Sequence, residues 1–460
     1  MFGFNTWPWQ HWAAVAPDAS AIESDMPLTW QALQDRVDCQ QHQLGEAPTV
    51  VLDSTLAPQE LVIGLLSAWQ AGKKTLVLNH GLSEEVTAAV LDNLDAYHYL
   101  APTLFDATST SPPPSASWQP DRPLTLTLTS GSTGAPKAVV HAARQHLASA
   151  AGLTQRLPFS GLADSVSAAC VDCWLLSLPL FHISGLAIVW RWLYKGAKLA
   201  LYPCRGERLA TALTHVSHAS LVPTQLHRVL PVLDKTSGAS SLSHVLLGGA
   251  AIPRPLAKQA EKKGIRCWCG YGMTETASTV TLKRADGQDD VGTTLPYRDV
   301  RVADDGEVIH RGETLTLGFW QAGILQPLDA SKGLASRDLA SWCTEIQPPT
   351  LRLIGRKDNQ FTCGGENVQP ELIEAHLQKC AEIGQVIVVP IDDSEFGARP
   401  LAIVQSDTHI DAKQLMAHCK TLPAYQRPVA FLPWPSLSPE AGIKPSRAML
   451  THWAQRQAID

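Results

Sequence analysis

The stretch Leu124-Thr-Leu-Thr-Leu-Thr-Ser-Gly-Ser-Thr-Gly-Ala-Pro-Lys137 decides how the chain is organised. Its first five residues alternate apolar and hydroxyl side chains, which predicts a half-exposed β-strand. Two glycines, several hydroxyls and a lysine follow, and backbone N–H groups, hydroxyls and one cation can together hold phosphate oxygens. The candidate phosphate-binding residues are Thr129, Ser130, Gly131, Ser132, Thr133, Gly134 and Lys137. Because Ala135 and Pro136 precede the lysine, this is not a Walker loop. A plain Gly/Ser turn remains the alternative.

The composition is typical of a large globular enzyme. The 460 residues are 45% apolar and 17% charged, which is enough to fill more than one core. The net charge of −6 provides no basic field for nucleic acid. No apolar run reaches the roughly 18 residues of a membrane span, and residues 1–9 lack the pattern of a secretory signal. The ten cysteines are scattered without paired zinc-like spacing, so we expect reduced cysteines and a cytoplasmic protein.

Strands and helices alternate through the first part of the chain. Residues 49–52 and 74–78 are short buried strands, and the helix predicted at 60–72 lies between them. A further helix is predicted at 83–94, with Ser83 as its N-cap. This order indicates a mainly parallel, layered α/β domain.

Three later segments also read as strands that end in polar loops. One covers 174–182 and ends at a turn over 183–185, and one at 244–247 opens into Gly248-Gly-Ala250. The third, from residue 267, reaches Tyr271-Gly-Met-Thr-Glu275. A ligand site is expected where the carboxyl ends of such strands meet.

A polar stretch near Lys357 marks a domain boundary. We expect an N-terminal domain over 1–356 and an α+β domain over 357–460, with helices at 370–380 and 412–422. The overall class is mixed α/β.

The motifs occur in one order that resembles the adenylate-forming superfamily of acyl-CoA ligases, luciferases and adenylation domains. They are Thr129 to Lys137, Leu178-Pro-Leu-Phe-His182, Gly248-Gly-Ala250, Gly270 to Glu275, Asp338, Gly355-Arg-Lys-Asp358 and Lys444. Within it, the chain is similar to the o-succinylbenzoate–CoA ligases of menaquinone biosynthesis. This narrower likeness rests on Trp7-Pro-Trp9, residues 174–185, 190–194, 218–226 and 245–253, and Gly442-Ile-Lys444.

The resemblance implies a large N-terminal domain, a small mobile C-terminal domain and a two-step reaction. A carboxylate would attack the α-phosphate of ATP, and CoA would then displace AMP. The implied substrates are 2-succinylbenzoate, ATP and CoA, with Mg²⁺ as the metal, and a homo-oligomer is possible. Three alternatives stay open: another aryl- or acyl-CoA ligase, an adenylation enzyme loading a carrier protein, and a catalytically silent nucleotide-binding protein.

The resemblance also implies roles for the nucleotide-binding residues. The phosphate loop would hold the β- and γ-phosphates, and Gly248, Gly249 and Ala250 would lie along the adenine. The loop that follows would contribute the Tyr271 ring to the adenine, Thr274 to the α-phosphate and Glu275 to Mg²⁺; Gly272 and Met273 belong to the same loop.

Further roles fall in the last third of the chain. Asp338 would accept the ribose hydroxyls, although Ala335-Ser-Arg337 precedes it where the family usually has Thr-Gly. Arg356 would pair with ribose or phosphate. Lys444 would bridge the carboxylate and the α-phosphate. The remaining candidates are Asp358 as a hinge, with Gly364 and Gly365 admitting the CoA arm.

The acyl pocket is expected near His182, which the resemblance makes a gate to CoA. The second carboxylate of the substrate requires a cation. Arg228 is the candidate, with Thr224 and Ser220 as donors, and Arg191 is the alternative. On spacing alone a solvated arginine is equally compatible with either position.

Overall fold

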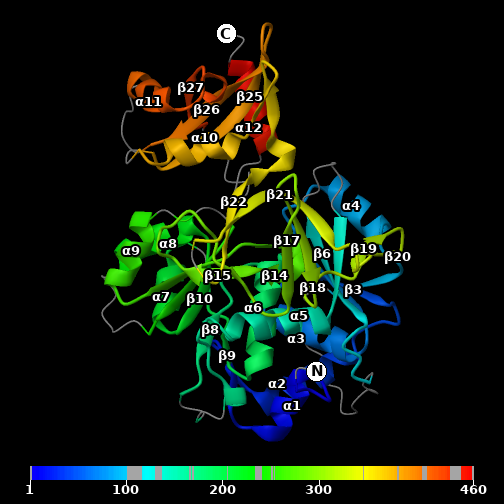
Figure 1. Ribbon diagram of the computed structural model, residues 1–460. Coiled ribbons are helices and arrows are strands. Elements are labelled where there is room, and N and C mark those ends of the chain that lie inside the picture. Colours follow the sequence, from blue (N-terminus) through cyan, green and yellow to red (C-terminus); the bar gives the residue numbers. More distant parts are fainter. Residues whose placement is uncertain are drawn as a thin grey trace. The chain divides into compact units, whose positions relative to one another are not determined.

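The computed structural model describes most of the chain (Figure 1), namely residues 3–100, 117–129, 137–164, 167, 170–204, 206–233, 241–249, 252, 254–345, 347–380, 383–406, 412–435 and 447–457. The chain divides into two compact units. The first comprises Met1–Val300, His310–Leu334 and Cys343–Leu351, and the second comprises Arg301–Ile309, Ala335–Trp342 and Arg352–Asp460.

A seven-stranded sheet in the first unit contains both ends of the 124–137 segment. Its order is β20-β19-β7-β6-β4-β3-β5. The strands are β3 (Thr49–Asp53), β4 (Lys74–Leu78), β5 (Tyr97–Leu100), β6 (Pro123–Thr129), β7 (Lys137–Ala142), β19 (Gly318–Gln321) and β20 (Ile324–Pro327). Strands β5, β3, β4 and β6 are parallel, and β7 returns antiparallel to β6. The phosphate-loop segment therefore joins the last parallel strand to the first antiparallel one.

A nine-stranded sheet forms the other half of this unit, in the order β16-β15-β12-β11-β10-β8-β9-β1-β2. The strands are β1 (Ser20–Glu23), β2 (Leu28–Thr29), β8 (Cys173–Leu175), β9 (Lys198–Ala200), β10 (His218–Leu221), β11 (His244–Leu247), β12 (Arg266–Cys269), β15 (Thr281–Arg284) and β16 (Thr293–Thr294). The strands from β1 to β12 along this order run parallel, so their carboxyl ends meet at one edge.

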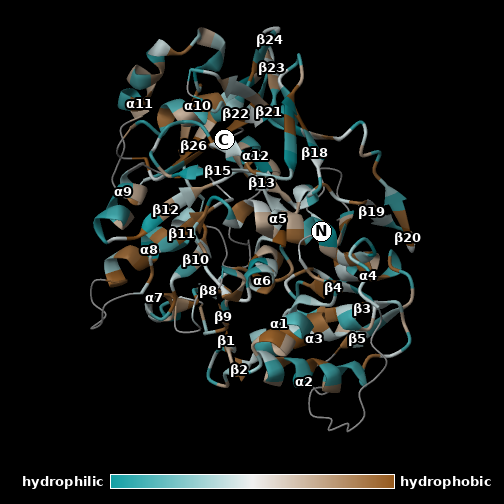
Figure 2. Cartoon of the chain, turned by 60° about the horizontal axis from the view of Figure 1, so that its bottom comes forward, coloured by the Kyte–Doolittle hydropathy of each residue, from teal (hydrophilic) through white to brown (hydrophobic). Residues whose placement is uncertain are grey.

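The helices of this unit are α1 (Pro8–Val15), α2 (Trp30–Gln41), α3 (Pro58–Gln70), α4 (Glu84–Asp92), α5 (Ala143–Thr154), α6 (Ile183–Lys195), α7 (Arg208–Thr214), α8 (Pro223–Leu233) and α9 (Arg254–Lys262). Helix α3 is apolar along most of its length (Figure 2), which suits its position inside the molecule. The Ser83 Oγ accepts a hydrogen bond from the Val86 N–H at 3.3 Å, confirming the predicted N-cap of α4.

Alternating side chains divide the first unit into layers. In β3, Val50 and Leu52 join a core that also receives Trp174 from β8 and residues of α3, α5 and α6. The intervening Val51 points into a second cluster with α4, and the opposite face of the nine-stranded sheet packs on α7, α8 and α9. The two large sheets, with helices packed against their faces, thus confirm the predicted layered α/β class.

One prediction about local structure was wrong. The segment 174–182 is a strand only through β8, which ends at Leu175, and the supposed turn at 183–185 is the first turn of α6. A Cβ at Gly185 would lie 2.2 Å from the Pro179 carbonyl oxygen, so the glycine permits α6 to start against the preceding chain.

The second unit is an α+β structure around the β25–β26 hairpin. Its strands include β23 (Phe361–Cys363), β24 (Glu366–Val368), β25 (Gln385–Asp393), β26 (Gly397–Gln405) and β27 (Phe431–Pro433), and its helices are α10 (Pro370–Leu377), α11 (Ala412–His418) and α12 (Arg447–Gln457). Val388 and Ala402 pack with α10 and α11, whereas Val389 and Leu401 pack with α12. Each face of the hairpin is therefore covered by helix.

A four-stranded sheet of β17 (Arg298–Val302), β18 (Glu307–Gly312), β21 (Leu334–Cys343) and β22 (Thr350–Arg356) contributes segments to both units. Its residues 301–309, 335–342 and 352–356 belong to the second unit, and they carry Asp338 and Arg356. The predicted boundary at 356/357 stays a prediction.

Candidate functional site

The phosphate-loop candidates begin and end on paired strands. Thr129 and Lys137 are opposite each other in the β6–β7 ladder, and the Thr129 hydroxyl donates to the Lys137 carbonyl at 3.4 Å. Lys137 is exposed at the first position of β7. Ser130, Gly131, Ser132, Thr133 and Gly134 lie outside the described residues. The ladder therefore places Thr129 and Lys137, the two residues that flank this segment, side by side.

The loop that contains Glu275 is a tight turn built from β13 (Gly272–Met273), the 3₁₀ turn Thr274–Thr276 and β14 (Ser278–Thr279). The Thr276 hydroxyl donates to the Met273 and Ser278 carbonyls at 3.0 and 3.2 Å. A Cβ at Gly272 would lie 1.9 Å from the Ser278 carbonyl oxygen, so only glycine allows this pairing. Ala277 and Ser278 have φ values of 50° and 94°, which are costly for residues other than glycine.

Thr316 connects this turn to the strand of Lys137. Its N–H donates to the Glu275 carbonyl at 2.8 Å, and its hydroxyl donates to the Val140 carbonyl at 2.7 Å. Because Val140 belongs to β7, the Glu275 turn is fixed against the strand that begins at Lys137. Two of the predicted phosphate and metal groups therefore lie on neighbouring segments of one unit.

Tyr271 precedes the turn and is held by a histidine. Its hydroxyl lies 3.0 Å from His310 Nε2, and the ring centroids are 5.7 Å apart. Burial lowers the pKa of His310 to about 4, so the imidazole is neutral at pH 7. The pair fixes the orientation of the Tyr271 ring. Sequence reasoning missed His310, because nothing in its neighbourhood links it to residue 271.

The glycine candidates follow β11. The Gly248 N–H donates to the Leu221 carbonyl at 3.3 Å, and Gly249 has a φ of 80°. Among the described residues other than its chain neighbours, a Val222 methyl is the one group within 4 Å of a Cβ built at Gly249, and none lies that close to a Cβ built at Gly248. The positive φ of Gly249 is itself a reason for glycine at this position. Ala250 lies outside the described residues.

The residues of the Glu275 turn suit Mg²⁺ better than a metal held by protein ligands alone. Within the described parts of the chain, no group of three or more His, Cys, Asp or Glu residues is arranged to hold a metal ion. Glu275 is the single carboxylate between Gly272 and Thr276. Mg²⁺ is commonly bound by one or two carboxylates together with substrate phosphates and water, so one carboxylate is a sufficient protein contribution.

The acyl-site candidates separate into a buried and an exposed group. Arg191, on α6, is only 2% exposed; its Nη1 lies 3.4 Å from Ser220 Oγ, and its guanidinium lies 4.9 Å from the Trp174 ring centroid. Thr224 and Arg228 are exposed on α8. Ser220 therefore lies beside Arg191, the alternative candidate, rather than beside Arg228, the first candidate.

Arg298 provides a useful comparison for Arg191. Both are buried, and burial lowers the pKa of each guanidinium to about 9. Arg298 donates to the carbonyls of Thr279, Ala148, Pro296 and Ser149 and to the Ser149 hydroxyl. Among the described residues Arg191 has no carboxylate partner in an ion pair, and its positive charge is balanced only by a hydroxyl and a ring. Such a site favours an anionic ligand.

His182 occupies the N-terminal cap position of α6, and its carbonyl accepts the Gly185 N–H at 3.0 Å. Its ring packs edge-on against Phe181, with centroids 4.6 Å apart. Although the side chain reaches solvent, desolvation by the surrounding protein lowers its pKa, which favours the neutral form at pH 7.

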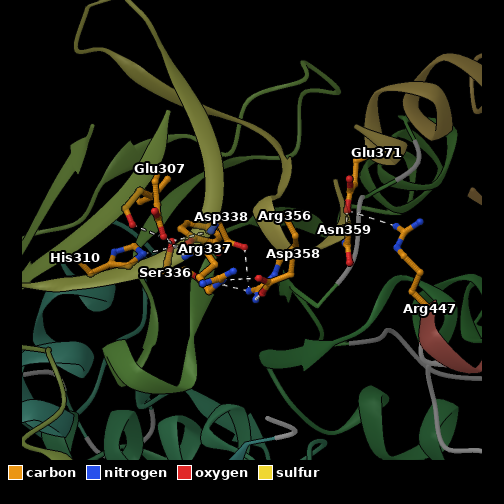
Figure 3. A network of polar contacts seen from close by, with 12 residues as sticks. Glu307, His310, Ser336, Arg337, Asp338, Arg356, Asp358, Asn359, Glu371 and Arg447 are labelled. Atoms are coloured by element: carbon orange, nitrogen blue, oxygen red, sulfur yellow. Dashed lines mark hydrogen bonds and ion pairs between the residues drawn. The ribbon is translucent and has the colours of Figure 1, made fainter. Parts of the chain in front are cut away.

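In the second unit, four charged side chains form an alternating network (Figure 3). Arg356 Nη1 lies 3.2 Å from Asp338 Oδ1, and Arg356 Nη2 lies 2.9 Å from Asp358 Oδ2. The other Asp358 oxygen pairs with Arg337. Partial burial lowers the pKa of Arg356, but the two carboxylates outweigh this and raise it overall. The predicted ribose and hinge residues thus contact one another directly.

The remaining candidates are two glycines and the C-terminal lysine. Gly364 and Gly365 form the β23–β24 turn with φ values of 57° and 85°, and the Gly364 N–H donates to the Phe396 carbonyl at 2.9 Å. Gly365 is exposed, and among the described residues other than its chain neighbours none lies within 4 Å of a Cβ built there. Lys444 lies outside the described residues.

Comparison with known proteins matches this chain to a family of AMP-binding enzymes, both by family profile and by individual relatives. The profile of the family described as AMP-binding enzyme matches residues 9–320. The 2-succinylbenzoate–CoA ligase of Salmonella typhimurium is 39% identical over 469 residues, which cover 98% of each chain.

Two solved structures extend this comparison. A variant of Escherichia coli MenE with bound OSB-AMS superposes with a TM-score of 0.83 at 38% identity, covering 99% of both chains. The o-succinylbenzoate coenzyme A synthetase of Bacillus subtilis in complex with ATP and magnesium ion superposes with a TM-score of 0.82 at 23% identity, covering 97% of this chain and 99% of that one. At this identity the second likeness concerns the fold alone. Over the described residues, no helix is both long and apolar enough to cross a membrane.

Proposed function

Because the chain belongs to the AMP-binding enzyme family, we propose that it is an AMP-forming acid–thiol ligase that converts 2-succinylbenzoate to 2-succinylbenzoyl-CoA for menaquinone biosynthesis. The observation that carries the substrate is the likeness over nearly the whole chain to a relative named 2-succinylbenzoate–CoA ligase, at 39% identity. The buried Arg191 supports it independently, since this substrate keeps a second carboxylate while the first one reacts.

The proposed reaction has two steps. A carboxylate oxygen of the acid attacks the α-phosphorus of ATP, and the bond to the β-phosphate oxygen breaks, so pyrophosphate leaves. The CoA sulfur then attacks the acyl carbon, and AMP leaves with the electron pair of the acyl–oxygen bond. Both steps build negative charge on phosphoryl or carbonyl oxygens, so fixed cations and N–H donors accelerate them more than a protein nucleophile would.

Lys137 and the residues from Ser130 to Gly134 would hold the β- and γ-phosphates while pyrophosphate departs. Thr274 would contact the α-phosphate, and Glu275 would hold Mg²⁺, which neutralises and orients the phosphates when bound. The contact through Thr316 supports this assignment, because it fixes the Glu275 turn on the strand of Lys137. Tyr271, oriented by His310, would offer its ring to the adenine along Gly248, Gly249 and Ala250.

Asp338 would accept the ribose hydroxyls, and Arg356 would both hold that carboxylate and meet ribose or phosphate oxygens. Lys444 would bridge the attacking carboxylate and the α-phosphate. Asp358 would act as the hinge of the C-terminal domain, with Gly364 and Gly365 beside the CoA arm and His182 gating its approach. These roles follow the resemblance.

For the second carboxylate, the structure favours Arg191 over Arg228. A desolvated guanidinium gains far more from a carboxylate than an exposed one does, and it presents the planar fork that suits bidentate pairing. Arg191 is buried beside the hydroxyl of Ser220, whereas Arg228 is on the exposed face of α8.

Pyrophosphate release and acyl-CoA formation test the function. We expect both with 2-succinylbenzoate, ATP, Mg²⁺ and CoA, and much slower turnover with benzoate or a fatty acid. Equal turnover of benzoate would indicate a general aryl-CoA ligase. Pyrophosphate release that free CoA does not accelerate would indicate a carrier-protein substrate, and no release with any acid would establish a silent nucleotide-binding protein. None of the ten cysteines, all of which lie in the described parts of the chain, forms a disulfide, which supports a reducing, cytoplasmic location.

A further inference from the structure

Arg337 occupies a backbone conformation that disfavours arginine. Its φ is 63°, in the left-handed region where glycine is the usual residue. The surrounding residues stabilise it there, since its N–H donates to Glu307 Oε1 at 3.0 Å and its guanidinium pairs with Asp358. A residue kept in such a conformation by specific contacts, directly before a predicted ligand residue, is a candidate for a functional role.

The side chain of Arg337 completes an alternating row of charges. Figure 3 shows Asp358 between Arg337 and Arg356, with one guanidinium on each carboxylate oxygen, and Arg356 continuing to Asp338. The Asp338 and Asp358 side chains are 14% and 21% exposed, less than the two arginines at 43% and 59%. Without Arg337, Asp358 would have Arg356 as its single guanidinium partner in this row and would compete more strongly with Asp338 for it.

We propose that Arg337 is a positioning residue for the nucleotide: it satisfies one oxygen of Asp358, so that Arg356 remains aligned with Asp338 for the ribose. The proposal rests on the proposed function, which assigns Asp338 to the ribose. It differs from that assignment because Arg337 itself need not touch the ligand. Lys357 supports the same arrangement, since its Nζ lies 2.9 Å from Glu307 Oε2, and Glu307 holds the Arg337 backbone.

Arg337→Gly tests the proposal without the usual risk of misfolding. Glycine adopts a φ of 63° freely, so the variant removes the guanidinium while relieving the backbone. Ala322→Gly is the matched control, because Ala322 has a φ of 49° in the β19–β20 turn and carries no charge. A thermal melt should show Arg337→Gly no less stable than the wild type.

Calorimetric titration of AMP and of ATP with Mg²⁺ gives the decisive readout. We expect Arg337→Gly to weaken both nucleotides by a similar factor of about 2–5 at low ionic strength, the range of an exposed ion pair. The factor should shrink toward one at about 0.5 M salt. In pyrophosphate exchange the KM for ATP should rise while the KM for 2-succinylbenzoate stays unchanged. In an Asp358→Asn background, Arg337→Gly should have no further effect on AMP affinity.

Several results would overturn the proposal. Unchanged AMP affinity in Arg337→Gly, or an equal loss in Ala322→Gly, would remove the side-chain role. If the variant loses much more affinity for ATP than for AMP, Arg337 acts by long-range attraction to the phosphates instead of by aligning Arg356 at the ribose. A wild-type protein that binds neither nucleotide would overturn the proposed function itself, whereas normal wild-type binding with an unaffected variant would overturn only this inference.

Discussion

Replacing Arg191 by methionine should stabilise the ligand-free protein and strongly slow its reaction with 2-succinylbenzoate. Burial moves the pKa of this guanidinium from 12.5 to about 9, which corresponds to roughly 5 kcal/mol of unfavourable free energy for the charged form. The contact with the Trp174 ring offsets about 2 kcal/mol of this cost, and the Ser220 hydrogen bond offsets about 1 kcal/mol. A methionine of similar length removes the cost, so we expect a gain of about 1–3 kcal/mol.

The activity should change in the opposite direction. If Arg191 pairs with the second carboxylate of 2-succinylbenzoate, removing it leaves that carboxylate buried and unpaired, which costs about 3–5 kcal/mol. The kcat/KM for 2-succinylbenzoate should therefore fall by about 100-fold or more, while benzoate, which lacks this group, should be affected much less. Guanidinium midpoints of the ligand-free variants and pyrophosphate release with both acids measure the two effects.

Arg298→Met is the matched control for this experiment. Arg298 is also buried but donates to carbonyls on several segments, so its loss leaves those acceptors unpaired and should lower the guanidinium midpoint. If Arg191→Met also lowers the midpoint and slows both acids alike, Arg191 is a structural residue, and the assignment of the second carboxylate to it is refuted.

Three other predictions concern Gly272 in the Glu275 turn, His310 and Lys444. Gly272→Ala places a Cβ 1.9 Å from the Ser278 carbonyl oxygen. It should lower the free energy of unfolding by about 1–3 kcal/mol, which thermal melts measure, and it should weaken ATP binding, which calorimetric titration measures. His310 has a folded pKa of about 4 against about 6.5 unfolded, so between these values the unfolded chain binds more protons. The free energy of unfolding should thus be highest above pH 6.5 and fall toward pH 4. In His310→Gln, the slope of this free energy against pH should be smaller by up to one proton. An unchanged slope would contradict the low pKa assigned to His310. Lys444→Ala should slow adenylate formation at least 100-fold but spare thioester formation from preformed adenylate, and equal loss of both half-reactions would exclude the role.

The sequence predicted the layered fold because its strands and helices follow their local periodicity. Residues 49–52 and 74–78 form β3 and β4, and the helix expected at 60–72 is α3 at Pro58–Gln70. The error at 174–182 has a physical reason. Apolar residues there are buried in loops around short β8, and burial without regular structure leaves the same hydrophobic signal as a strand.

The candidate site was predictable only in part. The family resemblance makes Tyr271, Glu275 and Asp338 candidate site residues, and Asp338 is a candidate even though Ala335-Ser-Arg337 departs from the usual pattern. The groups that hold those residues come from far away: His310 lies 39 residues beyond Tyr271, and Thr316 reaches back to both Glu275 and Val140. No local pattern reveals such partners. Likewise, spacing could not separate Arg191 from Arg228, because both are on helices and the difference is one of burial.

The Glu275 turn shows why these distant partners matter for chemistry. Ala277 and Ser278 are in left-handed conformations that an isolated peptide would avoid, so the turn keeps its shape only where other segments fix it. Ser149 donates to the Ala277 carbonyl at 2.5 Å, Arg298 donates to the Thr279 carbonyl at 3.0 Å, and Thr316 donates to Glu275. Tertiary contacts of the folded protein therefore offset the strain of the positive φ values at Ala277 and Ser278 before a nucleotide binds. Groups that are already in place need no reorganisation when charge develops, which is the condition under which a fixed carboxylate and fixed N–H donors lower a barrier most.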